Sequence, residues 1–311
     1  MLAVVGAAAS TLNLLAADAP VRCGIEMRNV ALHAADGVVL DVRRLDGEFV
    51  ARTAGRPPVF DDPSSYIVRL RDANIGMDAL ALNGMLRPTL VAKSSPISDV
   101  TIELADGRLH AKGKLHKGIT VPFSMTAVVS ATPDGRLRLH AEKLKAIGVP
   151  VKGLLDLLGL DVADLMKMPP GSGIRAEGDD LLLDATALMP PPRMEGRVRT
   201  VAINGNRLAL RLQGGATPQG RPATLPLPSA KNYLYFYGGS IRFGKLTMTD
   251  ADMQLIDADP SNAFDFYPAK YEDQLVAGYS RNTRRKGLQV FMPDYARTRA
   301  NGGILKAPRL R

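Results

Sequence analysis

The most constraining feature of the sequence is the stretch 106–130, in which apolar and polar residues alternate: DGRLHAKGKLHKGITVPFSMTAVVS. Alternation with a period of two places successive side chains on opposite faces of a β-strand. The stretch begins with an Asp-Gly pair, which favours the tight turn of a β-hairpin. It therefore predicts antiparallel strands that share one apolar face and one polar face.

The same alternation continues through most of the chain and predicts a β-rich α+β fold, in which a long curled antiparallel sheet wraps around one or two helices. A helical period replaces the alternation at 75–85 and 151–166, so helices are expected there. Turns are expected at Asp46-Gly47, Asp106-Gly107, Asp134-Gly135 and Asn204-Gly205. Strands are expected at 25–32, 38–44, 48–53, 66–74, 97–104, 109–115, 119–131, 137–144, 174–177, 181–187, 196–203, 207–213, 234–237, 240–243, 246–249, 253–257 and 287–292.

Composition divides the chain into four segments. Residues 1–19 are apolar and end in the A-x-A pattern of Ala17 and Ala19, so they resemble a secretory signal without a basic start. A hydrophobic N-terminal helix of a cytoplasmic protein is the alternative. Residues 20–213 form the expected β-rich domain, 214–230 a Pro- and Gly-rich linker or loop, and 231–311 a C-terminal β-rich extension. The signal-like segment predicts a periplasmic or other extracytoplasmic protein, peripheral to the membrane.

The chain is basic, with a formal net charge of +9. This charge favours attraction to anionic surfaces, so an anionic membrane surface is an expected partner. Trp is absent and aromatic residues make up only 5% of the chain. Platforms that stack nucleic-acid bases are therefore not expected, and neither is a nucleic-acid partner. A single cysteine, Cys23, excludes an internal disulfide.

No motif in the sequence indicates catalysis. The sequence lacks the G-x-S-x-G pattern of serine hydrolases, the phosphate-binding P-loop and the H-E-x-x-H pattern of zinc proteases. We therefore expect a protein that is not an enzyme and that needs no cofactor. A hydrolase whose triad the sequence does not reveal is the alternative.

Two groups of polar residues raise the alternative of a metal site. The first group, on expected polar strand faces, consists of His110, His116, His140 and Glu142. The second group, in the segment DADPSNAFDF, consists of Asp257, Asp259 and Asp265. The second group lacks the glycine and the terminal glutamate of an EF-hand loop. Exposed histidines and turn-capping aspartates account for both groups, and no metal is expected.

The expected strands greatly outnumber the one or two expected helices that could cover their apolar face. If the sheet curls strongly, the remaining space is an apolar groove or tunnel that holds acyl chains by shape and area. The 12 methionines of the chain suit an adaptable lining. The alternative is a packed core without such a space. The expected lining consists of Leu109, Leu115, Ile119, Val121, Phe123, Met125, Leu137, Leu139, Leu154, Leu155 and Leu158.

Four segments together resemble a known family: ISDVTIELADGRLHAKGKLHKGITVPFSMTAVV, TPDGRLRLHAEKLKAIGVPV, KGLLDLLGLDVADLM and GIRAEGDDLLLDATAL. Their order is similar to that of bacterial proteins of the tubular lipid-binding (TULIP-like) superfamily, typified by the mycobacterial lipomannan-elongation-associated lipid-binding protein. The resemblance covers roughly residues 66–212. It implies an extracytoplasmic protein that binds phospholipid within a sheet curled around a helix, without catalytic residues. The segment GGSIRFGKLTMTDADMQLID more weakly resembles the β-rich repeats of AsmA-like envelope proteins.

These observations predict a non-catalytic lipid-binding or lipid-transfer protein of the cell envelope. Its partner would be a phospholipid or another acyl lipid. The basic residues Arg281, Arg284 and Arg285 are expected near the mouth of the groove, where they would attract anionic headgroups. The alternative is a structural or interaction protein of the envelope with a filled core.

Overall fold

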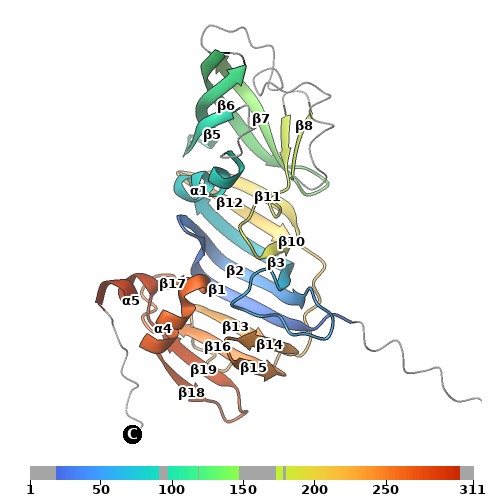
Figure 1. Cartoon of the computed structure of the whole chain (residues 1–311), viewed down its shortest axis with the longest axis vertical. Helices are drawn as coiled ribbons and strands as arrows, with labels where there is room; N and C mark the ends of the chain where they lie inside the picture. Colours follow the sequence, from blue (N-terminus) through green and yellow to red (C-terminus); the bar gives the residue numbers. More distant parts are fainter. Residues whose placement is uncertain (1–18, 91–96, 118, 147–172, 178–179, 302–311) are drawn as a thin grey trace, which may run out of the picture.

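The structure is a computed structural model that describes residues 19–90, 97–117, 119–146, 173–177 and 180–301. Its strands form three sheets, of eleven, six and two strands (Figure 1). Most neighbouring strands in these sheets run antiparallel. The prediction of a β-rich fold with large antiparallel sheets is therefore confirmed. The expected helix at 151–166 and nearly all of the signal-like segment lie outside the described residues.

The eleven-stranded sheet, here called the main sheet, joins the first and last parts of the chain. Its central path runs β11-β12-β3-β2-β1-β13-β16-β19-β18, while β10 pairs with β3 and β17 pairs with β1. Because β1 pairs directly with β13, the expected C-terminal extension shares one sheet with the N-terminal block. The strands are β1 (Arg22–Ala35), β2 (Val38–Ala51), β3 (Tyr66–Asp78), β10 (Arg193–Glu195), β11 (Arg197–Asn204), β12 (Arg207–Gln213), β13 (Tyr233–Tyr237), β16 (Asp252–Asp257), β17 (Phe264–Phe266), β18 (Tyr279–Asn282) and β19 (Leu288–Met292).

The six-stranded sheet contains the alternating stretch 106–130 and lies at the top of Figure 1, beyond β11 and β12. Its strands, in the order β4-β5-β6-β7-β9-β8, are β4 (Ile97–Ala105), β5 (Arg108–Lys117), β6 (Ile119–Ala131), β7 (Leu137–Ala146), β9 (Asp180–Leu183) and β8 (Ile174–Glu177). The remaining elements are β14 (Ser240–Phe243), β15 (Leu246–Thr249), the 3-10 helix η1 (Pro268–Lys270) and the helices α1 (Ala79–Leu90), α4 (Tyr271–Ala277) and α5 (Tyr295–Asn301).

Hydrogen bonds at two places help to hold the six-stranded sheet against α1 and the main sheet. The Asn83 amide on α1 donates to the carbonyl of Ile102 on β4 at 2.9 Å, and the Ile102 amide donates back to the Asn83 side chain at 2.8 Å. The backbone amide of Val198 on β11 donates to the carbonyl of Gly135 at 2.8 Å. The Asp134-Gly135 turn therefore lies directly against the main sheet.

The hairpin prediction at 106–107 is confirmed. Asp106 and Gly107 both have positive φ, 51° and 71°, which suits the turn type expected for Asp-Gly. The helix expected at 75–85 begins later, at Ala79, because Ile75 and Met77 pair with β12 as part of β3. The carboxylate of Asp78 then accepts the amide of Ala81 at 2.8 Å, which caps the start of α1.

The turn expected at Asp46-Gly47 is wrong, because both residues lie inside the continuous strand β2. The register between β2 and β3 shifts at this point, so the pair marks a β-bulge. A Cβ atom at Gly47 would lie 2.5 Å from the carbonyl oxygen of Arg69. Glycine is therefore required here by the close approach of β3 rather than by a turn.

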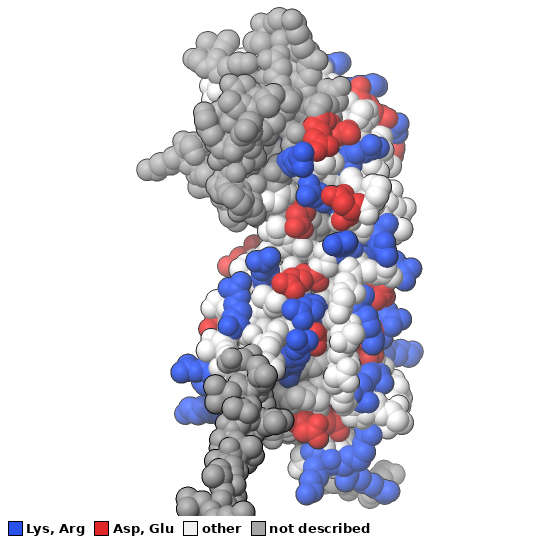
Figure 2. Space-filling view, turned by 90° about the vertical axis from the view of Figure 1, so that its right-hand side faces the viewer, with Lys and Arg blue, Asp and Glu red and all other residues white. Residues whose placement is uncertain are grey.

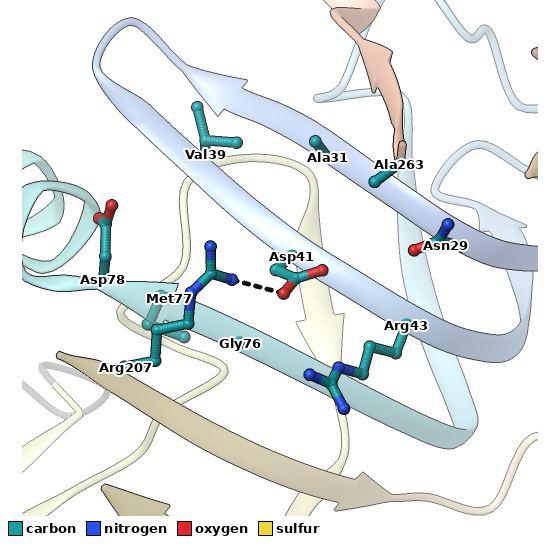
Figure 3. A pocket seen from close by; sticks show the side chains of 10 residues that line it. All are labelled: Asn29, Ala31, Val39, Asp41, Arg43, Gly76, Met77, Asp78, Arg207 and Ala263. Atoms are coloured by element: carbon teal, nitrogen blue, oxygen red, sulfur yellow. Dashed lines mark hydrogen bonds and ion pairs between the residues drawn. The ribbon is translucent and has the colours of Figure 1, made fainter. Parts of the chain in front are cut away.

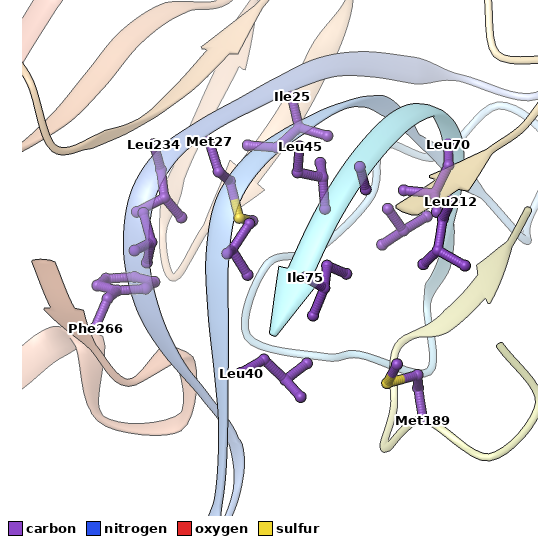
Figure 4. Packing of buried hydrophobic residues seen from close by; sticks show 14 of the residues in the cluster. Ile25, Met27, Leu40, Leu45, Leu70, Ile75, Met189, Leu212, Leu234 and Phe266 are labelled. Atoms are coloured by element: carbon purple, nitrogen blue, oxygen red, sulfur yellow. The ribbon is translucent and has the colours of Figure 1, made fainter. Parts of the chain in front are cut away.

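The inner face of the main sheet carries one contiguous apolar core. Figure 4 shows Ile25, Leu45 and Leu70 projecting from β1, β2 and β3 into this core. At the β13 end the core is aromatic: Phe60 stacks on Phe243 with ring centroids 4.6 Å apart. The core thus continues from the N-terminal strands into the C-terminal block.

The outer face of the main sheet carries three buried carboxylates, each matched by arginines. Asp46 is 1% exposed and lies within 3.6 Å of Arg28, 2.8 Å of Arg44 and 2.9 Å of Arg71. Glu48 pairs in the same way with Arg22 and Arg69, and Glu26 with Arg28 and Arg221. The apolar stems of these arginines cover the sheet while their charged ends reach water. Figure 2 shows basic side chains along the length of one face of the molecule, with acidic ones between them.

The Pro- and Gly-rich residues 214–230 lie across the outer face at the β13 end. Leu225 packs on the buried rings of Tyr233, Tyr235 and Tyr237. The side chain of Gln254 accepts the Leu227 amide at 2.7 Å and donates to the Leu227 carbonyl at 3.4 Å. This segment therefore covers the sheet as part of the fold.

We predict that Asp46→Ala lowers the free energy of unfolding by about 2–3 kcal/mol, because it leaves three neighbouring arginines without their shared counter-charge. The matched control is Glu103→Ala, which breaks an exposed ion pair with Lys112 and should cost less than about 0.5 kcal/mol. Urea unfolding followed by circular dichroism measures both changes. Equal effects of the two substitutions would contradict the structural role of the buried carboxylate.

Candidate functional site

An apolar cavity of about 220 Å³ lies on the inner face of β1, β2 and β3. Its position follows from the alternation of these strands, which directs every second side chain toward the inner face. Figure 4 shows Leu40, Ile75 and Met189 around this space. The floor of the cavity consists of Met27, Leu40, Val42, Leu45, Phe49, Val68 and Ile75.

Two further segments form the walls of the cavity. One wall is 189–194, whose run of three prolines has fixed φ angles and is stiff. The parallel pairing of β10 with β3 holds this wall against the sheet. The opposite wall includes Leu234, Phe266 and Pro268. Four lining residues are exposed and mark the rim where the cavity meets solvent: Asp61, Pro63, Pro191 and Ala269.

The polar side chains at one side of the cavity are already engaged with partners. His33 Nε2 lies 2.5 Å from Asp265 Oδ1, and the His33 ring stacks on Tyr267 with centroids 5.2 Å apart. The Tyr267 hydroxyl donates to Asp36, and this hydrogen bond raises the pKa of Tyr267 to about 12. Among the described residues that line the cavity there is no Ser, Thr or Cys beside the His33–Asp265 pair.

The charged groups at the rim are acidic. Asp61 accepts the amide of Gly244 and the hydroxyl of Tyr271. Burial raises the pKa of Tyr66, which stays neutral and stacks on Phe49 with centroids 4.4 Å apart. The lining residues that the structure describes include neither Lys nor Arg. These residues therefore offer a large apolar contact area without a counter-ion for an anionic group.

A second hollow, here called the outer groove, lies on the opposite face of the same strands (Figure 3). It has a volume of about 550 Å³ and a floor of small residues, among them Ala31 and Gly76. Arg207 Nη1 donates to Asp41 Oδ2 at 2.5 Å within it. The residues of the two hollows alternate along β2, so the sheet itself separates the cavity from the outer groove.

The described residues of the lining predicted from sequence lie in the six-stranded sheet, outside the lining of the cavity. The described side chains of this set are buried or packed on the core, with Val121 3% and Phe123 8% exposed. Leu115 and Ile119 lie on β5 and β6, and Leu154, Leu155 and Leu158 lie outside the described residues. None of the predicted residues whose side chains are described lines the cavity: Leu109, Val121, Phe123, Met125, Leu137 and Leu139.

The residues of the two metal alternatives have other partners. His140 pairs with Asp180 at 2.7 Å, and Glu142 pairs with Arg108 at 2.6 Å. Asp257 accepts the side-chain amide of Asn232 at 2.8 Å. Within the described ranges, no group of three or more His, Cys, Asp or Glu is placed to hold a metal ion.

The sequence reasoning missed the cavity because its walls come from segments without a periodic pattern. A sequence signal near this wall was the run Met189-Pro190-Pro191-Pro192, whose prolines cannot donate the hydrogen bonds of a central strand. Basic residues expected at a mouth lie elsewhere: Arg281 lies over the rings of Tyr279 and Phe291, and Arg285 donates to the Thr224 carbonyl.

Comparisons with known proteins add no family: no family model, no curated protein and no solved structure matches this chain. Among the residues that the structure describes, no helix has the length and apolar character needed to cross a membrane.

An acidic cluster near the cavity predicts a pH effect on stability. Burial, together with Asp257, Asp265 and Asp259, raises the pKa of Asp294 to about 6. A raised carboxyl pKa means that the folded state favours the protonated, neutral form of Asp294. The stability that protonated Asp294 contributes is therefore full below about pH 4 and is lost as the pH rises through about 6.

We therefore expect Asp294→Asn, which keeps the acceptor for the Asp265 amide, to weaken the fall in unfolding free energy between about pH 4 and 7. The exposed turn variant Asp106→Asn is the control and should follow the unsubstituted protein. Urea unfolding across this pH range measures the difference. An unchanged pH profile in Asp294→Asn would exclude this role.

Proposed function

We propose that this chain is a non-catalytic lipid-binding protein that holds an acyl chain in the apolar cavity on the inner face of the main sheet. The observation that carries the proposal is the cavity itself, about 220 Å³ in volume and lined almost wholly by apolar side chains. An apolar cavity of about 150 Å³ already binds benzene. The cavity therefore has room for part of a single acyl chain rather than for a whole diacyl lipid.

The lining suits a flexible apolar ligand. Met27, Met189 and Met194 lie on different sides of the cavity and can adapt to ligand shape. Each methylene moved from water into an apolar site contributes about 0.8 kcal/mol. A chain taken from a bilayer leaves an apolar environment already, so the exchange between membrane and cavity is near neutral. Near-neutral exchange is what a lipid shuttle requires.

The expectation from sequence that the sheet curls around an apolar groove is part of this proposal. A main sheet curled around its inner face would enclose the cavity together with the 189–194 wall and the η1 segment. The resemblance to the tubular lipid-binding superfamily and an extracytoplasmic location agree with the proposal. They rest on the sequence alone.

Lipid extraction tests the proposal directly. The protein is purified from cells that contain lipid, and native mass spectrometry and organic extraction report any bound lipid. We expect a single-chain lipid or one chain of a larger lipid in substoichiometric or full occupancy. Protein without recoverable lipid, and without affinity for an added acyl probe, favours the alternative of an envelope structural protein with a filled core.

Filling part of the cavity should weaken the binding of an acyl ligand. We predict that Ala34→Leu, which replaces a lining methyl by an isobutyl group, weakens a fluorescent acyl probe by about tenfold or more, because the added atoms occupy the ligand volume. Ala202→Leu makes the same change at an exposed position of β11 and should leave affinity within about twofold. Equal affinities in the two variants would remove the cavity as the site.

The acidic rim predicts a preference among ligand head groups. We expect dodecanol to bind about tenfold more tightly than dodecanoate at about pH 8, because no lining Lys or Arg pairs with a carboxylate. Displacement of the same acyl probe by each compound measures the ratio. Tighter binding of dodecanoate would contradict the predicted absence of a cationic partner at the rim.

A further inference from the structure

The outer groove combines an unpaired cation, a local backbone distortion and a hollow. Arg43 lines the groove and is exposed. Within the described part of the chain its guanidinium makes no hydrogen bond or ion pair. In Figure 3 it projects from β2 beside the Arg207–Asp41 pair, without a dashed line of its own. The groove therefore contains a strong hydrogen-bond donor that the fold does not use.

The backbone places Arg43 there by a distortion of two strands. The register between β2 and β3 shifts between Val42 and Arg44, which makes Arg43 the extra residue of a β-bulge. On the neighbouring strand, Asn29 has a φ of 50° and is skipped in the pairing of β1 with β2. Bulges and left-handed residues of this kind cost stability and often direct a side chain at a functional site.

The groups around Arg43 define the chemistry of a ligand. A guanidinium has five N–H donors in a planar fork and binds phosphate oxygens in pairs. Arg207 uses Nη1 on Asp41 and keeps further donors for the same ligand. One carboxylate oxygen of Asp78 accepts a hydrogen bond from the Ala81 amide. The other oxygen can accept one from a hydroxyl group of the ligand. The groove thus provides hydrogen-bond donors for a phosphate group next to carboxylates that can accept hydrogen bonds from hydroxyl groups.

The size of the groove agrees with a small organic molecule. Its volume of about 550 Å³ lies within the usual range for ligand pockets, about 300–1,000 Å³. Its small floor residues, Ala31, Gly76 and Ala263, leave the space between the polar side chains open. Bare phosphate would leave most of this space empty.

We infer that the outer groove binds a hydroxyl-bearing phosphate ester of the glycerol phosphate type, with Arg43 and Arg207 on the phosphate and Asp41 and Asp78 beside the hydroxyl groups. The ligand is either a free ester or the head group of an anionic lipid, since both present the same atoms. The sheet separates this site from the apolar cavity, so the inference does not depend on the proposed function.

Isothermal titration calorimetry on the full chain tests the inference with glycerol 3-phosphate, with inorganic phosphate and with glycerol. A second arm uses sedimentation with phosphatidylcholine vesicles, with and without phosphatidylglycerol. The variant is Arg43→Gln. The matched control is Arg56→Gln, which removes the same charge from an exposed loop position that lies outside the groove. Thermal melting confirms that both variants fold.

We expect glycerol 3-phosphate to bind more tightly than phosphate, glycerol not to bind, and Arg43→Gln to weaken binding about tenfold or more. Arg56→Gln should change the affinity for glycerol 3-phosphate by less than about twofold. Binding confined to phosphatidylglycerol vesicles, with the same dependence on Arg43, identifies the lipid head group as the source. Absence of binding in both arms, or equal losses in the two variants, overturns the inference.

Discussion

The fold depends on how the two faces of a large sheet are covered when few helices are available to cover them. Pairing between strands satisfies the backbone, but each face must still be shielded from water or made polar. On the outer face, Asp46, Glu48 and Glu26 are buried beneath arginine side chains. On the same face, the segment 214–230 covers the three tyrosines of β13. The inner face carries the large apolar core.

The inner face is filled unevenly, and the cavity is the consequence. Most of the 8 Phe and 8 Tyr residues lie in 231–311. Large rings such as Phe236 and Phe243 pack edge to face at 5.0 Å and fill that end of the core. The β1–β3 end has mainly Leu, Val, Ile and Met around Phe49 and Tyr66, opposite a wall with a stiff proline backbone. Aliphatic side chains against this wall leave the space in which we propose that an acyl chain binds.

The parts of the fold predicted from sequence are those decided by neighbours in the chain. The hairpin at Asp106-Gly107 follows from two residues that accept positive φ. The opposite case is Asp46-Gly47, which has the same residue types but lies within a strand. There, the arginines of β1 and β3 stabilise the aspartate and β3 requires the glycine, and both come from distant parts of the chain. The outer groove was missed for the same reason, since Arg207 and Asp41 are joined only across β3.

The sequence by itself determined the β-rich class, the positions of most strands and the polarity of their two faces, because a period of two is a local property. Only the tertiary structure decided that β1 pairs with β13 and that the Met189–Pro192 run lies over β3. It also decided that Arg43 lies unpaired in a hollow. Pairing between distant strands and the spaces between packed segments depend on contacts that no local pattern encodes. For that reason the apolar face was recognised in the sequence, while the place where it stays open was not.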